Sequence, residues 1–292
     1  MQEQEQRHSR SFPALAEVNA MPFTAKNFSL DFTDGAAVMA VINLTPDSFY
    51  EGSRYSSQQA VEYTKQACEK GAAILDIGAQ STAPNSTPIT DEEEIERLIE
   101  PLKAIRKACH VPISVDTFSL RVAKAALENG ADIINDVSGK ASPEMAELIA
   151  AHGAGWIVMH TGGLSSAEER IESTDIKEEI NSFFEKAVRT AEEKSLSHNQ
   201  LCLDPGIGFG KSRKDDLDII ANFYKLKSHG CAKLAALSRK RVTKLCGDAL
   251  TGTVISNAAC IAGGADIIRV HDIEQGFAAA KMAKLLTEAR NG

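Results

Sequence analysis

The chain has 292 residues, of which 43% are hydrophobic and 25% charged, the composition of an ordinary globular protein with enough apolar side chains for a sizeable core. Its formal net charge is −8 and its basic residues form no block, which argues against a nucleic-acid partner. No apolar run reaches the length of a membrane span and the N-terminus lacks the apolar core of a signal peptide, so we expect a cytoplasmic protein without a membrane partner.

The start of the chain differs in composition from the rest. Its opening residues, MQEQEQRHSR, are too polar to bury surface, and we expect residues 1–21 to form a disordered N-terminal tail. Residues 22–292 are then expected to form a single domain, whose first segment, residues 22–34, builds a small element at the floor of the main fold.

Short apolar runs alternate with amphipathic stretches along the remaining chain. The apolar runs, which we predict to be buried parallel strands, cover residues 37–43, 73–78, 111–117, 132–137, 155–160, 201–204, 233–238 and 265–271. The amphipathic stretches, which we predict to be helices, cover residues 58–70, 92–108, 120–129, 143–152, 176–194, 217–228, 253–262 and 274–290. Eight strands that alternate with eight helices predict an α/β fold, and within that class a closed (β/α)8 TIM barrel.

Polar side chains stand at the carboxyl end of every predicted strand. In chain order they are Asn43, Asp76, Asp116 with Thr117, Asn135 with Asp136, His160, Asp204, Ser238 with Arg239 and Lys240, and Arg269 with His271. In a barrel these ends converge on one mouth, where active sites lie. Any one buried Asp or Asn is more often a hydrogen-bonded structural residue, and His160, which follows Val158 and Met159, is interpreted as a packed core histidine. The convergence of the whole set therefore carries the functional interpretation.

The chemistry of these residues divides into two parts. The set Asp116, Asn135, Asp204 and Lys240 combines two acceptors, one amide and one cation, which suits a flat heterocycle with N–H and C=O edges. The set Asn43, Arg269 and His271 suits an anion such as pyrophosphate. The sequence therefore predicts a ring held at depth and an anionic leaving group nearer the rim.

A glycine-rich segment, residues 205–212, follows the sixth predicted strand. It is not a nucleotide-binding loop, because that motif needs a glycine five residues before Gly210 and this chain has Pro205 there. We interpret the glycines as permitting a sharp turn beside the mouth, with Phe209 presenting an aromatic face to a planar ligand.

Eight segments resemble, in the same order, the motifs of the dihydropteroate synthase family. They are NLTPDSF at residues 43–49, LDIG with ST at 75–82, SVDT at 114–117, INDV at 134–137, MH at 159–160, DPGIGFGK at 204–211, LSRK at 237–240 and IRVH at 268–271. The resemblance implies a transferase of folate biosynthesis. Such an enzyme joins p-aminobenzoate to 6-hydroxymethyl-7,8-dihydropterin pyrophosphate, releases pyrophosphate with the help of Mg²⁺, and forms a homodimer.

The resemblance also implies a role for each matching position. It assigns the pterin to Asp116, Asn135, Asp204 and Lys240, the pyrophosphate to Asn43, Arg269 and His271, the Mg²⁺ to Asn43, and the p-aminobenzoate to Thr82, Phe209 and Arg239. It implies that Asp116, Lys240 and Arg269 are the catalytic residues, with pyrophosphate departing before the amine attacks.

The first and second loops depart from the family pattern. Residues 50–53 read YEGS, and Ala83 stands where the family usually has an arginine that helps to bind pyrophosphate. Other departures are Thr161, Ala236 and Arg241, and Arg54 or Arg241 would be the cation that restores the lost charge. Two alternatives therefore stay open: a paralogue that binds a pterin without turnover, and a pterin-dependent methyltransferase. Arg269 and His271 argue against the methyltransferase, because a methyl donor carries no pyrophosphate.

Overall fold

The fold is a closed barrel of parallel strands surrounded by helices. The computed structural model describes residues 21–25, 27–44, 57–80, 89–162 and 173–291. The barrel strands are β3 (Ala37–Asn43), β4 (Ile74–Gly78), β5 (Ile113–Thr117), β6 (Ile133–Asp136), β7 (Gly155–Met159), β8 (Leu201–Asp204), β9 (Ala232–Ala235) and β10 (Ile267–Val270). Each pairs in parallel with its neighbours, and β10 returns to β3, which closes the barrel. The prediction of a (β/α)8 TIM barrel is confirmed.

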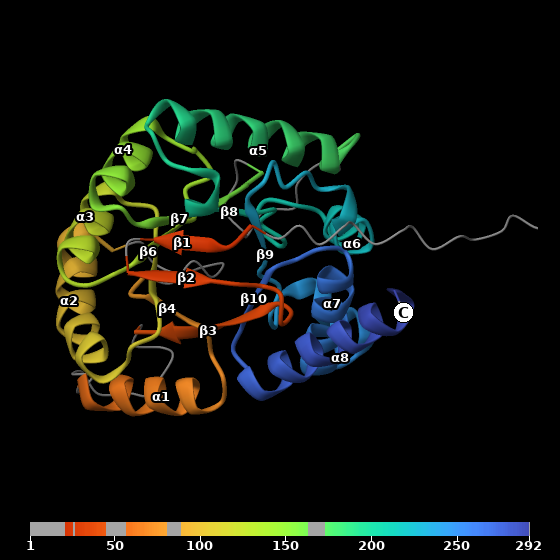
Figure 1. The fold of residues 1–292 in the computed structure, drawn as a ribbon, viewed down its shortest axis with the longest axis horizontal. Helices are drawn as coiled ribbons and strands as arrows, with labels where there is room; N and C mark the ends of the chain where they lie inside the picture. The colour runs from red at the N-terminus through yellow and green to blue at the C-terminus, as the bar shows by residue number, and fades with distance from the viewer. Residues whose placement is uncertain (1–20, 26, 45–56, 81–88, 163–172, 292) are drawn as a thin grey trace, which may run out of the picture.

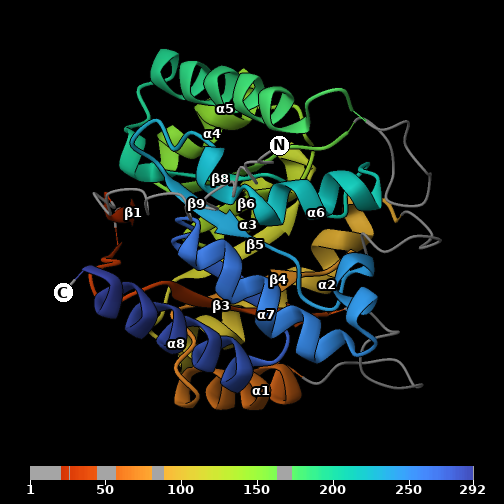
Figure 2. The same ribbon diagram turned by 90° about the vertical axis from the view of Figure 1, so that its right-hand side faces the viewer.

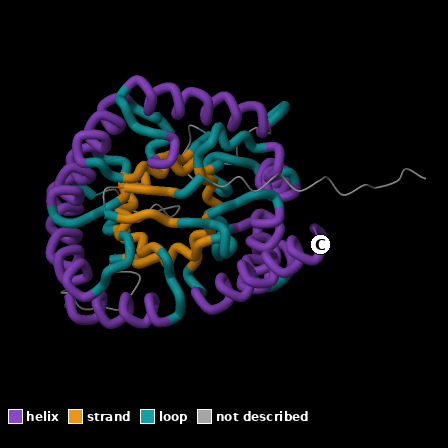
Figure 3. The backbone as a smooth tube through the Cα atoms, viewed as in Figure 1, coloured by secondary structure: helices purple, strands orange, loops and turns teal. Residues whose placement is uncertain are grey.

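Helices follow the strands and form the outer ring, as Figure 3 shows. They are α1 (Ser57–Glu69), α2 (Asp91–Ala108), α3 (Leu120–Glu128), α4 (Pro143–His152), α5 (Ile176–Glu193), α6 (Arg213–Ala221), α7 (Ala249–Ala262) and α8 (Ile273–Asn291). The described residues also include the short 3-10 helices η2 (His198–Gln200), η3 (Phe223–Lys225) and η4 (Arg241–Cys246). Within the described part of the chain, no helix combines the length and apolar character needed to cross a membrane.

The predicted boundaries of α6 are wrong. The apolar spacing predicts a helix over residues 217–228, but α6 begins at Arg213 because Ser212 caps it: the Ser212 side chain accepts from the Asp215 N–H, and the Asp215 side chain accepts in return from the Ser212 N–H. Such a capping box stabilises a helix start that carries no apolar pattern. After Ala221 the chain tightens into η3.

A β-hairpin lies at the amino-terminal end of the barrel (Figure 1). Its strands, β1 (Phe23–Ala25) and β2 (Phe28–Leu30), pair in antiparallel fashion. The side chain of Phe23 is fully buried, and a Cβ added to Gly155, at the start of β7, would lie 2.9 Å from the Phe23 ring. Phe23 thus packs against the barrel floor, in the segment where we expected a small element.

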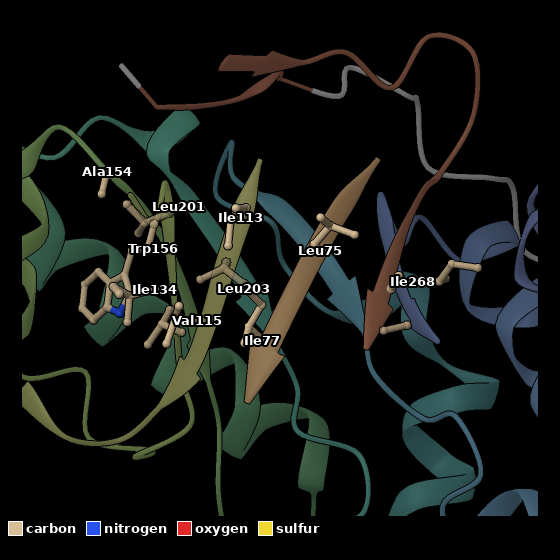
Figure 4. Close-up of a cluster of buried hydrophobic side chains, with 14 of the residues drawn as sticks. Leu75, Ile77, Ile113, Val115, Ile134, Ala154, Trp156, Leu201, Leu203 and Ile268 are labelled. Atoms are coloured by element: carbon tan, nitrogen blue, oxygen red, sulfur yellow. The ribbon is translucent and has the colours of Figure 1, made fainter. Parts of the chain in front are cut away.

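Apolar side chains form two layers, one inside and one outside the barrel. The inner layer contains Phe23 and Phe32 together with one or more residues from most strands, including Met39, Ile74, Ile133, Ile157, Cys202, Leu234 and Ile267. Residues of opposite parity face the helices. Figure 4 shows members of this outer layer, among them Leu75, Ile77, Trp156 and Leu203.

The parity of the inner layer decides which polar residues point into the barrel. Side chains two residues apart on a strand face the same way. Met39, Ile74, Ile133, Cys202 and Ile267 belong to the inner layer. The residues in phase with them further along their strands are Asn43, Asp76 with Gly78, Asn135, Asp204, and Arg269 with His271. The barrel is therefore apolar at its floor and polar towards the carboxyl ends of its strands.

Candidate active site

A row of register partners crosses the carboxyl ends of four adjacent strands. Asn43 on β3 pairs with Gly78 on β4, Gly78 with Asp116 on β5, and Asp116 with Asn135 on β6. A Cβ added to Gly78 would lie 3.8 Å from both Asn43 Oδ1 and Asp116 Cβ. Because Gly78 has no side chain, Asn43 and Asp116 face a shared space above it.

Arg269 links the two predicted halves of the site. Its Nε donates to Asp76 Oδ2 at 2.6 Å, and its Nη2 donates to Asp116 Oδ2 at 2.8 Å. The side chain of Asp76 has no exposed surface, and those of Arg269 and Asp116 are 17% and 12% exposed. Arg269 was predicted to bind an anion and Asp116 a ring, and the structure joins them in one ion-pair cluster.

Asn135 lies beside this cluster, and only the Nδ2 of its side-chain amide makes hydrogen bonds there. Its Nδ2 donates to both oxygens of Asp76, at 3.3 Å and 3.5 Å. Its Oδ1 is buried and has no hydrogen-bond partner among the described residues. A buried amide oxygen without a donor is costly unless a ligand supplies one.

The glycine-rich turn after β8 brings Lys240 and Phe209 together. The Nζ of Lys240 lies 4.3 Å from the centre of the Phe209 ring and donates to the Ile207 carbonyl at 2.6 Å. Gly208 has a φ of +83°, and a Cβ there would lie 3.0 Å from the Lys240 side chain. Glycine thus gives Lys240 room beside the mouth, and the positive φ fits the sharp turn that we expected of this segment.

Asp204 starts this turn and is buried. Its Oδ1 accepts from the Gly206 N–H at 2.7 Å. Gly206 has a φ of +64°, and a Cβ there would overlap with the carbonyl oxygen of His160. His160 itself is buried, with its ring edge-on to Phe183 at 5.3 Å, in agreement with a packed core histidine.

His271 is held by Ser238, which follows the neighbouring strand β9. The Ser238 Oγ lies 3.2 Å from the backbone N–H of His271, from which it accepts, and 3.0 Å from His271 Nδ1. A serine hydroxyl has one hydrogen and two lone pairs, so the Ser238 Oγ can donate to Nδ1 while it accepts from the backbone N–H. We expect this arrangement, which leaves the imidazole proton on Nε2 as a donor for an anion.

Burial shifts the acid–base behaviour of the cluster. Desolvation raises the pKa of Asp116 to about 7, against the attraction of Arg269 and with the help of repulsion from Asp76. Desolvation also lowers the pKa of Lys240 to about 8, although Asp204 opposes that shift. The pKa of His271 falls to about 4, through burial and then the charges of Arg269 and Arg239, so its ring is neutral near pH 7.

The remaining predicted residues fall in different places. The Arg239 guanidinium donates two hydrogen bonds to the Asp272 carboxylate, from Nε at 2.8 Å and from Nη2 at 2.5 Å. The Arg239 side chain is 56% exposed. Arg241 donates from Nη2 to the Lys211 carbonyl at 2.9 Å. Thr82, Ala83, Arg54 and residues 50–53 lie outside the described residues. Roles for Arg239 and Thr82 stay predictions.

Thr117 and Asp136 are strand-end residues that do not face the site. Each has the parity of an outer-layer residue, Val115 and Ile134 respectively. Asp136 accepts from Trp156 Nε1 at 3.4 Å, behind β6. Two other residues, Asp76 in the middle of β4 and Ser238 after β9, received no ligand role from the sequence but do contact the predicted site residues.

The position of Asn43 suits a residue that is one of several ligands of a Mg²⁺ ion. Magnesium usually takes one or two protein oxygens and completes its octahedron with water and substrate phosphates. Asn43 is half-buried at the rim, and its Oδ1 faces the space above Gly78 without a hydrogen bond to any residue that the structure describes. Within the same described ranges, no group of three His, Cys, Asp or Glu side chains forms a metal cage.

Comparison with known proteins agrees with this geometry. The model of the family described as pterin binding enzyme matches residues 39–271, which run from within β3 to just past β10, and the chain belongs to this family. The dihydropteroate synthase of Synechocystis is 36% identical over 281 residues, covering 93% of this chain and 97% of that protein.

Solved structures show the same fold. The dihydropteroate synthase of Clostridium difficile, determined with pteroic acid, has a TM-score of 0.82 and 31% identity, covering 88% of this chain and 98% of that one. The Thermus thermophilus enzyme in complex with 4-aminobenzoate has a TM-score of 0.79 and 32% identity, covering 91% and 100%. The chain spans only 31% to 51% of three longer curated relatives named for folate synthesis.

Proposed function

We propose that this protein is a dihydropteroate synthase, which condenses 6-hydroxymethyl-7,8-dihydropterin pyrophosphate with p-aminobenzoate to give 7,8-dihydropteroate and pyrophosphate. The observation that carries the proposal is the row Asn43, Gly78, Asp116 and Asn135, with Arg269 bonded across it, in a chain of the pterin-binding family. The Synechocystis relative, which this chain matches over 97% of that protein's length, bears this name.

The pterin would occupy the deep part of the mouth. Asp116 and Asp204 supply acceptors for ring N–H groups, the unpartnered Oδ1 of Asn135 supplies another, and Lys240 supplies a donor for a ring carbonyl. Lys240 must exchange its bond to the Ile207 carbonyl for the ligand. Phe209 and Arg239 would border the p-aminobenzoate pocket together with Thr82.

The reaction needs electrostatic stabilisation at both ends of the breaking bond. The bond between the exocyclic methylene carbon and the pyrophosphate oxygen breaks, and its electron pair leaves with the oxygen. The amine nitrogen of p-aminobenzoate then attacks the methylene carbon and loses a proton. Ionised Asp116 stabilises the cationic ring, while Arg269 and the Nε2–H of His271 stabilise the departing anion. Mg²⁺, held by Asn43 and phosphate oxygens, would neutralise further charge on the leaving group.

The proposal is tested by incubating the purified protein with the pterin pyrophosphate, Mg²⁺ and p-aminobenzoate. We expect pyrophosphate release that depends on p-aminobenzoate, and its loss in Asp204→Asn. Asp136→Asn is the matched control, because Asp136 is also a buried carboxylate but faces away from the site. Pterin binding without turnover would instead support the non-catalytic paralogue suggested by Ala83.

We also propose a homodimer formed through α7 and α8. Figure 2 shows these helices side by side on one face of the molecule. On them Ile255, Met282, Leu285 and Leu286 are between 50% and 62% exposed. The last three lie at helical spacings of three and four, so they share one face of α8. Light scattering is expected to give twice the chain mass for the wild type and the chain mass for Leu286→Asp.

A further inference from the structure

Asp76 lies at the centre of the polar cluster, yet it has no ligand role in the proposed reaction. It stands in the middle of β4, its side chain has no exposed surface, and it points into the barrel between the apolar floor and the mouth. It accepts from Arg269 Nε at 2.6 Å and from Asn135 Nδ2 at 3.3 Å and 3.5 Å. One carboxylate thus contacts a residue of the ring site and a residue of the anion site.

The contact with Asn135 determines which way that amide faces. An ionised carboxylate only accepts hydrogen bonds, so the Asn135 Nδ2 must turn towards Asp76. A rotation by half a turn would set the amide oxygen against the carboxylate oxygens. The observed orientation leaves Oδ1 buried and without a donor in the described part of the chain, as an acceptor directed at a ligand N–H.

The contact with Arg269 affects the anion site in the opposite sense. The Arg269 guanidinium lies between two carboxylates, those of Asp76 and Asp116. Asp76 holds the guanidinium in place, but its negative charge reduces the attraction that Arg269 exerts on a phosphate. Asp76 therefore favours the ring while it restrains the binding of the anion.

We propose that Asp76 is a positioning residue that fixes the Asn135 amide as an acceptor for the pterin and weakens the hold of Arg269 on pyrophosphate. The inference rests on the proposed function and deepens it. A restrained anion site suits a reaction in which pyrophosphate must leave, because tight binding of the product would slow its release.

The test is the isosteric variant Asp76→Asn, which removes the charge but keeps the shape. Binding of 6-hydroxymethylpterin and of inorganic pyrophosphate is measured separately by titration calorimetry. We expect pterin affinity to fall about tenfold, since the Asn135 amide is no longer forced to one orientation. We expect pyrophosphate affinity to rise about threefold or more, since a neighbouring negative charge is gone. Asp136→Asn should change neither affinity more than about twofold.

A fall in pterin affinity together with a rise in pyrophosphate affinity would distinguish a positioning role for Asp76 from a merely structural one. If both affinities fall together in Asp76→Asn, or if neither changes, the inference is wrong. A wild-type protein that binds no pterin would overturn the proposed function and this inference with it. Normal wild-type binding with an unchanged variant would overturn the inference alone.

Discussion

Arg269 Nη2 lies 2.8 Å from Asp116 Oδ2, so the cation expected to hold pyrophosphate is paired with the carboxylate expected to hold the pterin. Arg269 lies on β10 and Asp116 on β5, and the two residues are 153 positions apart in the chain. Any ligand that contacts one of them changes the electrostatic environment of the other. Ring binding and anion binding are therefore coupled, and their dependence on pH should show it.

Pterin affinity should depend on pH through Asp116 and Lys240. Asp116, with a pKa of about 7, is the stronger acceptor when ionised, and Lys240, with a pKa of about 8, is the stronger donor when protonated. We expect the affinity to be highest between these values, which belong to the coupled cluster as a whole. Relative to the wild type, Asp116→Asn should remove the acidic limb and Lys240→Met the alkaline limb. The ratio of variant to wild-type affinity is compared at each pH, because protonation of the ligand affects both proteins equally. Identical pH profiles for variant and wild type would contradict the roles given to Asp116 and Lys240.

The free energy of unfolding should respond to Asp116 with a defined sign. Its pKa in the folded protein lies above the ordinary value of 3.8, so its contribution to stability is complete below that value and is lost as the pH rises to about 7. Asp116→Asn cannot ionise and escapes this loss. Urea unfolding at pH 5 and pH 8 should show the variant gaining stability over the wild type, with the larger gain at pH 8. An equal difference at both values would refute the raised pKa.

The turn after β8 should tolerate no side chain at Gly206. Ala there meets a positive φ and an overlap with the His160 carbonyl oxygen. Gly247 also has a positive φ, of +95°, but nothing lies within 4 Å of an added Cβ. We expect Gly247→Ala to cost about 1–2 kcal/mol through backbone strain alone. Gly206→Ala should cost more and abolish pterin binding, and equal losses in thermal unfolding would contradict a steric clash at Gly206.

The tautomer of His271 can be measured directly. With a pKa of about 4, the ring is expected to be neutral at pH 6.5, with its proton on Nε2 because Ser238 occupies Nδ1. Long-range nitrogen–proton NMR spectra should show this state for the resonance that disappears in His271→Gln. Ser238→Ala should shift the tautomer balance and weaken pyrophosphate binding. A charged ring at pH 6.5 would refute the lowered pKa.

The barrel could be predicted from the sequence because its signal is repeated eight times. Each strand is an apolar run and each helix an amphipathic stretch, so single errors such as the start of α6 did not alter the fold. That helix begins with Arg213, Lys214 and acidic residues, which carry no apolar spacing, and only the capping by Ser212 reveals its start.

The sequence predicted most residues of the site, but it did not predict which of them contact one another. Nearly continuous apolar strands obscure which face is inward, so the sequence alone groups Asp136 with Asn135 although they point in opposite directions. The bond between Arg269 and Asp76 joins residues 193 positions apart on strands that are not neighbours. It depends on the length of the arginine side chain and on the stagger of the strands: Arg269 pairs with Met39, whereas Asp76 pairs with Val41, further along β3.

In the described part of the chain, Phe23 and the inner apolar layer fill the barrel floor, so the polar groups beside Asn135 and Asp116 are approached from the carboxyl ends of the strands. A ring that binds beside Asn135 and Asp116 must therefore enter before a second molecule occupies the space nearer the rim. Because the proposed reaction joins the two molecules, the ring leaves as part of the product, so the depth of the site sets the order of addition.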